Sequence, residues 1–166
     1  MAWTFRILVV ANVTATSEEL LATLRERAGR DTCRFTLVVP APAVGPVGRE
    51  AAQRTLDEAL QHLREAGIEV EGVIGDHDPI SAVTDEFDPQ TYDEIVISTL
   101  PTGVSKWLQV DLPHRIERTT GVPVTHVVAE PQRREPRTER VTKPDSYGVL
   151  SPFQAVTGKR PGRPGA

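Results

Sequence analysis

Five short apolar segments alternate with amphipathic segments along the first 130 residues, and this alternation restricts the chain to few folds. The apolar segments are rich in β-branched residues and have the length of strands. They are Phe5–Ala11, Arg34–Val39, Ile68–Gly75, Asp93–Ser98 and Pro123–Ala129. Strands that alternate with helices predict an α/β domain built on one parallel sheet, with right-handed crossovers and helices on both faces.

The segments between these strands carry helical patterns and helix-boundary signals. A capping-box pattern at Thr16–Glu19 predicts a helix with Thr16 as its N-cap, and Gly29 predicts the end of that helix. Residues 40–48 contain several prolines and glycines, so an irregular loop is expected there. Three further helices are expected: Ala52–Leu63, Ile80–Phe87 after Pro79, and a helix that begins at Asp111 as its N-cap and runs through Thr119.

The apolar patterns of the strands also predict their order in the sheet. The first and fourth strands are continuously apolar, which is typical of central strands, whereas Ile68–Gly75 alternates in the manner of an edge strand. A doubly wound five-stranded parallel sheet in the order 3-2-1-4-5 meets both conditions. Ligands bind such sheets where the strand order reverses, here between the first and fourth strands. The loops at residues 11–14 and 98–105 meet at that point.

Four motifs, in the same order, resemble those of the universal stress protein family over residues 4–129. They are ILVVAN (7–12), GDHDPISAV (75–83), DEIVISTLP (93–101) and GVPVTHVV (121–128). The segments STLP, SKWL and DLPHR also resemble a branch of universal-stress-like proteins from high-GC bacteria. The resemblance implies the universal stress protein or adenine nucleotide α-hydrolase-like fold, and it makes ATP or another adenine nucleotide the ligand to consider.

Some members of this family bind ATP through the motif G-x-x-G-x(9)-G-[S/T], from which this chain departs. The glycines let backbone N–H groups approach the phosphates, and the last pair opens a helix. The resemblance places the first glycine pair on Ser98 and Pro101, the second pair near Val110 and Asp111, and the family's aspartate on Asn12. Proline has no backbone N–H, and a carboxylate beside a phosphate is repulsive. The resemblance therefore implies a degenerate nucleotide crevice.

The same loop nevertheless contains hydroxyls and cations that would bind an anion in another way. With the neighbouring crevice positions they form the candidate nucleotide site: Ala11, Asn12, Val39, Ser98, Thr99, Thr102, Gly103, Ser105, Lys106, His114 and Arg115. The alternative is that the hydroxyls satisfy backbone groups of the turn, the cations are solvated, and Asp111 only caps a helix. Trp107 is expected to cover the crevice or to pack on the neighbouring helix.

The other reactive residues form no recognisable catalytic or metal site in the sequence. The run Asp76-His77-Asp78 predicts a solvated turn, because adjacent residues rarely converge on one ion. A helix cap or an i,i+3 contact explains the spacing of Asp111 and His114. No nucleophile–base arrangement is evident, Cys33 is expected to be inert, and His126 reads as a surface residue of an edge strand.

The charge distribution separates an acidic body from a basic tail. Residues 1–130 carry 11 Lys and Arg against 20 Asp and Glu, a balance of −9, whereas residues 131–166 carry 8 against 3, a balance of +5. We therefore expect residues 1–130 to form one domain. Residues 131–166 are expected to be a proline-rich tail that is disordered or docks through residues 146–156, on this domain or on an unknown protein partner. The acidic body makes nucleic acid an unexpected partner.

The remaining features place the protein in the cytoplasm, with no membrane partner and no metal. The sequence has no apolar run of membrane-spanning length and no leader pattern, and Cys33 is its single cysteine. The resemblance implies a homodimer that pairs through the last strand, residues 123–129, and so covers an exposed sheet edge.

Three functional hypotheses follow from these observations. The first is a non-catalytic stress-response or regulatory binding protein whose crevice has lost the ATP grip. The alternative is an adenine-nucleotide (ATP or AMP) binding protein, including a slow ATPase, that uses the Ser/Thr/Lys/Arg loop in place of the glycines. The third, an enzyme acting on another small substrate, has no nucleophile–base set in the sequence to support it.

Overall fold

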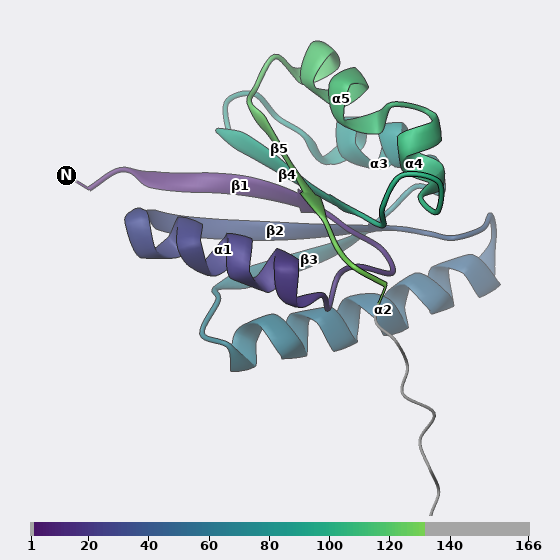
Figure 1. Ribbon diagram of the computed structural model, residues 1–166, viewed down its shortest axis with the longest axis horizontal. Helices are drawn as coiled ribbons and strands as arrows, with labels where there is room; N and C mark the ends of the chain where they lie inside the picture. The colour runs from purple at the N-terminus through teal and green to yellow at the C-terminus, as the bar shows by residue number, and fades with distance from the viewer. Residues whose placement is uncertain (1, 132–166) are drawn as a thin grey trace, which may run out of the picture. The chain divides into compact units, whose positions relative to one another are not determined.

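The computed structural model describes residues 2–131, which form a five-stranded sheet with helices on both faces (Figure 1). The strand order is β3-β2-β1-β4-β5, and every neighbouring pair is parallel. The elements are β1 (Thr4–Val10), α1 (Glu18–Arg30), β2 (Thr32–Pro40), α2 (Pro46–Glu65), β3 (Val70–Gly75), α3 (Pro79–Glu86), β4 (Glu94–Thr99), α4 (Lys106–Gln109), α5 (Leu112–Thr120) and β5 (Val124–Val128). The predicted fold class and strand order are confirmed.

Strand β1 is the central strand and is buried on both of its faces. Ile7 and Val9 pack into the core formed with α1 and α2, whereas Leu8 and Val10 pack into a second core formed with α3 and α5. All four side chains are 0% exposed. Figure 1 shows α1 and α2 below the sheet and α3, α4 and α5 above it. Burial of an aliphatic side chain of this size contributes roughly 1.5–3 kcal/mol, so this strand fixes the two layers.

Strands β3 and β5 form the two edges of the sheet. In β3 only Val70 is fully buried and the following residues are partly or fully exposed, which agrees with the edge position predicted from its alternating pattern. In β5 the buried residue is Val127, and its neighbour Val128 is 46% exposed. Both edges therefore combine one covered face with one partly open face.

The beginning and end of α1 differ from the prediction. The N-cap is Ser17, whose Oγ accepts a hydrogen bond from the backbone N–H of Leu20 at 3.2 Å, and not Thr16. The Glu19 carboxylate accepts from the N–H of Glu130 at 3.2 Å. Gly29 lies inside the helix, which continues to Arg30. A glycine is tolerated near a helix end even where no left-handed residue is required, so it was a poor stop signal here.

Helix α2 begins six residues before the predicted helix, inside the segment 40–48 that was expected to be irregular. Gly45 occupies the N-cap position with φ of 90°, and Pro46 is the first helical residue. Proline suits this position because its missing N–H would have no partner within the helix. The short helix α4 was also not predicted, since four residues are too few for a periodic pattern.

None of the helices within residues 2–131 is long and apolar enough to cross a membrane. Residues 132–166 lie outside the described residues. The predicted domain boundary near Glu130 and the docking of residues 146–156 therefore stay predictions.

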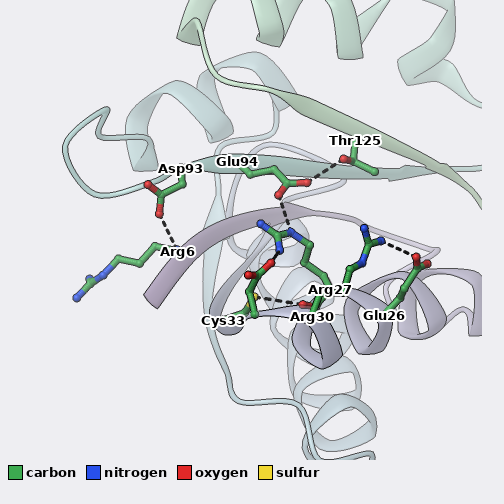
Figure 2. A network of polar contacts seen from close by, with 9 residues as sticks. Arg6, Glu26, Arg27, Arg30, Cys33, Asp93, Glu94 and Thr125 are labelled. Carbon is green, nitrogen blue, oxygen red and sulfur yellow. Dashed lines mark hydrogen bonds and ion pairs between the residues drawn. The ribbon is translucent and has the colours of Figure 1, made fainter. Parts of the chain in front are cut away.

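A largely buried ion pair joins α1 to the first residue of β4 (Figure 2). The Arg27 Nε donates to Glu94 Oε2 at 3.0 Å, and the Thr125 hydroxyl donates to the other carboxylate oxygen at 2.9 Å. The Arg27 guanidinium also lies 4.6 Å from the centre of the Phe5 ring and pairs with Asp31. The side chains of Arg27 and Glu94 are only 20% and 16% exposed. Their contact thus links α1, β4 and β5.

Arg27→Met is expected to lower the free energy of unfolding by about 2 kcal/mol, because it leaves the Glu94 carboxylate partly buried without its cation. Arg30→Met on the same helix is the matched control. Arg30 pairs with Glu26 but is 66% exposed, so its loss should cost less than about 0.5 kcal/mol. Urea unfolding of the full chain measures both values, and equal losses would contradict the structural role given to Arg27.

Candidate functional site

A cavity of about 570 Å³ lies at the carboxyl ends of the strands, where the sheet order reverses between β1 and β4. The residues that line it come from four strand ends and from the two short helices that follow β4. They are Asn12, Val13, Thr14, Pro40, Ala41, Pro42, His77, Asp78, Pro79, Ile80, Ser98, Thr99, Leu100, Val104, Ser105, Lys106, Trp107, Val110 and Arg115. This is the size and location of a small-molecule site in an open α/β sheet.

The structure brings part of the predicted site together around this cavity. Six of the predicted residues line it: Asn12, Ser98, Thr99, Ser105, Lys106 and Arg115. Ala11 and Val39 are fully buried in the core beneath it. Thr102 and Gly103 are exposed in the turn and do not line it. His114 is 73% exposed and faces Asp111.

One wall of the cavity was not predicted from the sequence. It is formed by Pro40–Pro42 after β2 and by His77–Ile80 after β3. The sequence could have predicted this wall, because all strands of a parallel sheet have their carboxyl ends on the same side of the sheet and each following loop begins there. Trp107 lines the cavity and also packs against the core beneath α3 and α5, which agrees with both expectations for it.

Two side-chain hydrogen bonds fasten the β1–α1 loop to the neighbouring strands. The Thr14 hydroxyl donates to the carbonyl oxygen of Ser98 at 3.1 Å, across the switch between β1 and β4. The Asn12 amide donates to the carbonyl oxygen of Pro40 at 3.2 Å, across to β2. A carboxylate at residue 12 has no proton to donate to Pro40, so asparagine fits this contact. The floor of the cavity therefore carries no carboxylate from β1.

The turn after β4 does not direct its backbone at the cavity in the way that a glycine loop would. The N–H groups of Val104 and Ser105 both donate to the carbonyl oxygen of Pro101, each at 3.1 Å. Gly103 takes the left-handed conformation, with φ of 92°, that closes this turn. These two donors are used inside the turn and do not point at an anion in the cavity.

Asp111 occupies the N-cap position of α5, but its side chain does not cap the helix. Its backbone is left-handed, with φ of 51°, and the helix has no side-chain cap hydrogen bond. The Asp111 Oδ1 lies 2.6 Å from the Nδ1 of His114, and Asp111 does not line the cavity. The prediction of a side-chain cap was wrong. The geometry removes the expected like-charge contact between this carboxylate and an anion in the cavity.

The cavity has a cationic side and a buried hydroxyl without a partner. Lys106 of α4 and Arg115 of α5 both line it. The Ser98 Oγ, in a residue that is 1% exposed, has no hydrogen-bond partner among the described residues. A buried hydroxyl without a partner is costly, so a ligand oxygen that reached it would be stabilised.

Opposite these cations, the Asp78 carboxylate is occupied by the start of α3. It accepts from the Ser81 N–H at 2.9 Å and from the Ser81 hydroxyl at 2.8 Å. These hydrogen bonds, the backbone bond first, lower the pKa of Asp78. Its charge is thus satisfied within the helix cap.

A hydroxyl–imidazole pair stands beside the cavity and was not predicted. The Thr99 Oγ1 lies 2.7 Å from the Nε2 of His126, across the pairing of β4 with β5. Thr99 lines the cavity and is 2% exposed. Burial, and to a lesser degree the nearby His114, lower the pKa of His126. His126 is exposed on the edge strand, as predicted, and it also contacts Thr99.

The other reactive groups of the described residues lie outside any catalytic or metal cluster. Within residues 2–131, no three His, Cys, Asp or Glu side chains gather in a way that would hold a metal ion. His77 pairs with Asp76 at 2.9 Å. Cys33 is buried, and burial raises the pKa of its thiol, which disfavours the reactive thiolate.

The fold with this cavity is that of universal stress proteins. The chain aligns with the universal stress protein from Archaeoglobus fulgidus at 20% identity and a TM-score of 0.56, over 74% of this chain and 93% of that one. The A. fulgidus structure in complex with dAMP matches at 19% identity and 0.56, over 76% and 99%. A universal stress protein in complex with cAMP matches at 20% and 0.50, over 78% and 99%. No protein-family model and no curated protein sequence matches the chain.

Asp78→Ala is expected to lower the free energy of unfolding by about 1 kcal/mol at pH 7, because α3 loses its cap. The folded-state pKa of Asp78 is lowered, so this stabilisation is present above the unfolded-state pKa of about 3.9 and is lost as the pH falls through the folded-state value. Urea unfolding between pH 7 and pH 3 measures the difference. Asp85→Ala, an exposed change on the same helix, should alter stability little, and an equal loss there would contradict the cap.

Proposed function

We propose that this chain is a non-catalytic binding protein of the universal stress type, and that its cavity takes an adenine nucleotide with a single phosphate. The observation that carries the proposal is the combination of Lys106, Arg115 and the unpartnered Ser98 hydroxyl around one cavity at the sheet reversal. Asp111 is paired with His114 away from the cavity, so no carboxylate opposes an anion on that side.

The two sides of the cavity suit the two ends of a nucleotide. The cationic side, next to Ser98 and Ser105, suits a phosphate, because charge-assisted hydrogen bonds from Arg and Lys are the strong contacts to such groups. The wall of Pro40–Pro42 and Ile80 offers apolar surface for a base. A volume of about 570 Å³ falls in the usual range for small-molecule sites.

A single phosphate fits the backbone of the β4–α4 turn better than three. The N–H groups of Val104 and Ser105 are bonded to Pro101, whose own nitrogen carries no hydrogen. A triphosphate would need such donors along its length. Two of the similar structures hold dAMP and cAMP, each with one phosphate, which supports the same choice of ligand.

The non-catalytic part of the proposal rests on the same turn. Phosphoryl transfer depends on hydrogen-bond donors that stabilise charge on the transferred group. In this turn the backbone N–H groups of Val104 and Ser105 are already bonded to Pro101. A protein that binds a nucleotide without consuming it is suited to regulation. We therefore place its role in a stress response, in the cytoplasm, as a sensor of nucleotide level.

Pairing of two copies through β5 belongs to the same proposal. β5 is an outer strand of the sheet, and Val128 on it is 46% exposed. An outer strand carries backbone N–H and C=O groups on its free side that favour pairing with another strand. Light scattering of the full chain would give the mass of a dimer, and a monomer at every concentration would contradict this part.

Arg115→Gln is expected to weaken AMP binding by at least about ten-fold, since a charge-assisted contact to a phosphate contributes about 1.5–3 kcal/mol. The matched control is Arg118→Gln, which changes an exposed arginine of the same helix that does not line the cavity. Isothermal titration calorimetry with AMP, cAMP and ATP measures the affinities. The control should bind as the unchanged protein does.

Each of three results would contradict a different part of this proposal. ATP binding much more tightly than AMP would contradict the single-phosphate ligand. Release of inorganic phosphate from ATP, abolished by Arg115→Gln, would contradict the non-catalytic role and favour a slow ATPase. Absence of binding by all three ligands at millimolar concentration would remove the nucleotide from the proposal.

A further inference from the structure

The Thr99–His126 pair joins the cavity to a titratable group that does not line it. Thr99 is the last residue of β4 and lines the cavity. His126 stands on the neighbouring strand β5, and its Nε2 is 2.7 Å from the Thr99 Oγ1. His126 does not line the cavity, so a ligand there would be coupled to it through Thr99.

A hydroxyl has one proton, and this limits what Thr99 can offer on its two sides. When neutral His126 carries its proton on Nδ1, its Nε2 accepts from the Thr99 hydroxyl, and only oxygen lone pairs of Thr99 are left for a ligand. When His126 is protonated, its Nε2–H donates to the Thr99 oxygen, and the hydroxyl proton is free to turn towards the cavity. The first state repels a phosphate oxygen, and the second donates a hydrogen bond to it.

We propose that His126 is a positioning residue of the cavity, which sets through Thr99 whether the site accepts an anion, so that binding of a phosphate takes up a proton. The inference rests on the proposed function, since it requires an anionic ligand in the cavity. It goes beyond that function because it makes affinity for the ligand depend on pH.

The charged groups around His126 are consistent with this coupling. His114 of α5 faces it and is itself paired with Asp111. Lys106 and Arg115 line the cavity on the other side of Thr99. A phosphate near these cations would offset their charge and favour the protonated imidazole.

The direction of the pH dependence follows from the state of His126 without ligand. Burial lowers its pKa from the usual 6.5, so the imidazole is neutral at pH 7. Because an anion favours the protonated form, binding raises the pKa of His126, and by linkage the affinity rises as the pH falls through that region.

The experiment compares AMP affinity at pH 7.5 and pH 5.5 by calorimetry for the unchanged full chain, His126→Gln and His114→Gln. Lowering the pH should raise the affinity of the unchanged protein about five-fold relative to His126→Gln, because binding raises the pKa of His126 only in the unchanged protein. The phosphate of AMP also titrates near pH 6, but this is common to all proteins and cancels in the ratio. His114→Gln should keep the pH dependence, because His114 does not contact Thr99.

Two threonine variants and one direct titration keep the test independent of the folding of His126→Gln. Thr99→Ser keeps the hydroxyl and should keep the pH dependence, whereas Thr99→Val removes the hydroxyl and should abolish it. An NMR titration should show the His126 ring pKa rising when AMP is added to the unchanged protein. Parallel pH profiles in all variants, with AMP bound, would overturn this inference alone. Absence of AMP binding at either pH would overturn the proposed function together with it.

Discussion

The burial of β1 between two layers of helices is the constraint on which the rest of this structure depends. Ile7 to Val10 are 0% exposed, and the strand pairs in parallel with β2 on one side and β4 on the other. The chain must leave β1 towards β2 and later return to its other side, so the strand order reverses there. The loops after β1 and β4 lead to helices on opposite faces of the sheet. They therefore diverge at that point, and the cavity forms between them. The location of the site thus follows from the same apolar pattern that builds the core.

This dependence explains which features the sequence could predict. The strand order followed from burial alone, because a strand buried on both faces must be apolar throughout and β3, at an edge, need not be. Helix ends were less well predicted, because they depend on single contacts. Thr16 and Ser17 are adjacent hydroxyl residues, and either could cap α1; Ser17 does so, while the Glu19 carboxylate also accepts from Glu130, 111 residues away in the sequence. Local patterns carry no information about such a partner.

The same reasoning separates the predicted and unpredicted parts of the site. Ser98 and Thr99 were predicted because they end β4 at the reversal, and Lys106 because it follows them. Pro40–Pro42 and His77–Ile80 lie at or beyond the ends of strands farther from the reversal. The contact of Thr99 with His126 spans 27 residues and depends on the register of β4 with β5. A one-residue shift of that register would turn His126 to the other face, and no local spacing in the sequence records the register. Asp111 was misassigned for a local reason, since its left-handed backbone turns the carboxylate to His114.

The strand order creates this cavity, and the cavity does not depend on a glycine motif that binds phosphate. At the positions that the resemblance assigns to the family's glycines this chain has Ser98, Pro101 and Val110, and the reversal of the sheet leaves an open volume there. The difference lies in what grips the ligand. Backbone N–H groups in a glycine loop are fixed and do not titrate, whereas hydroxyls, Lys106 and Arg115 must be ordered on binding and respond to their neighbours. A site whose ligand contacts come from side chains is therefore less rigid, and its affinity depends on the neighbouring groups that contact those side chains. The hydrogen bond between Thr99 and His126 is the contact through which that dependence reaches the edge of the sheet.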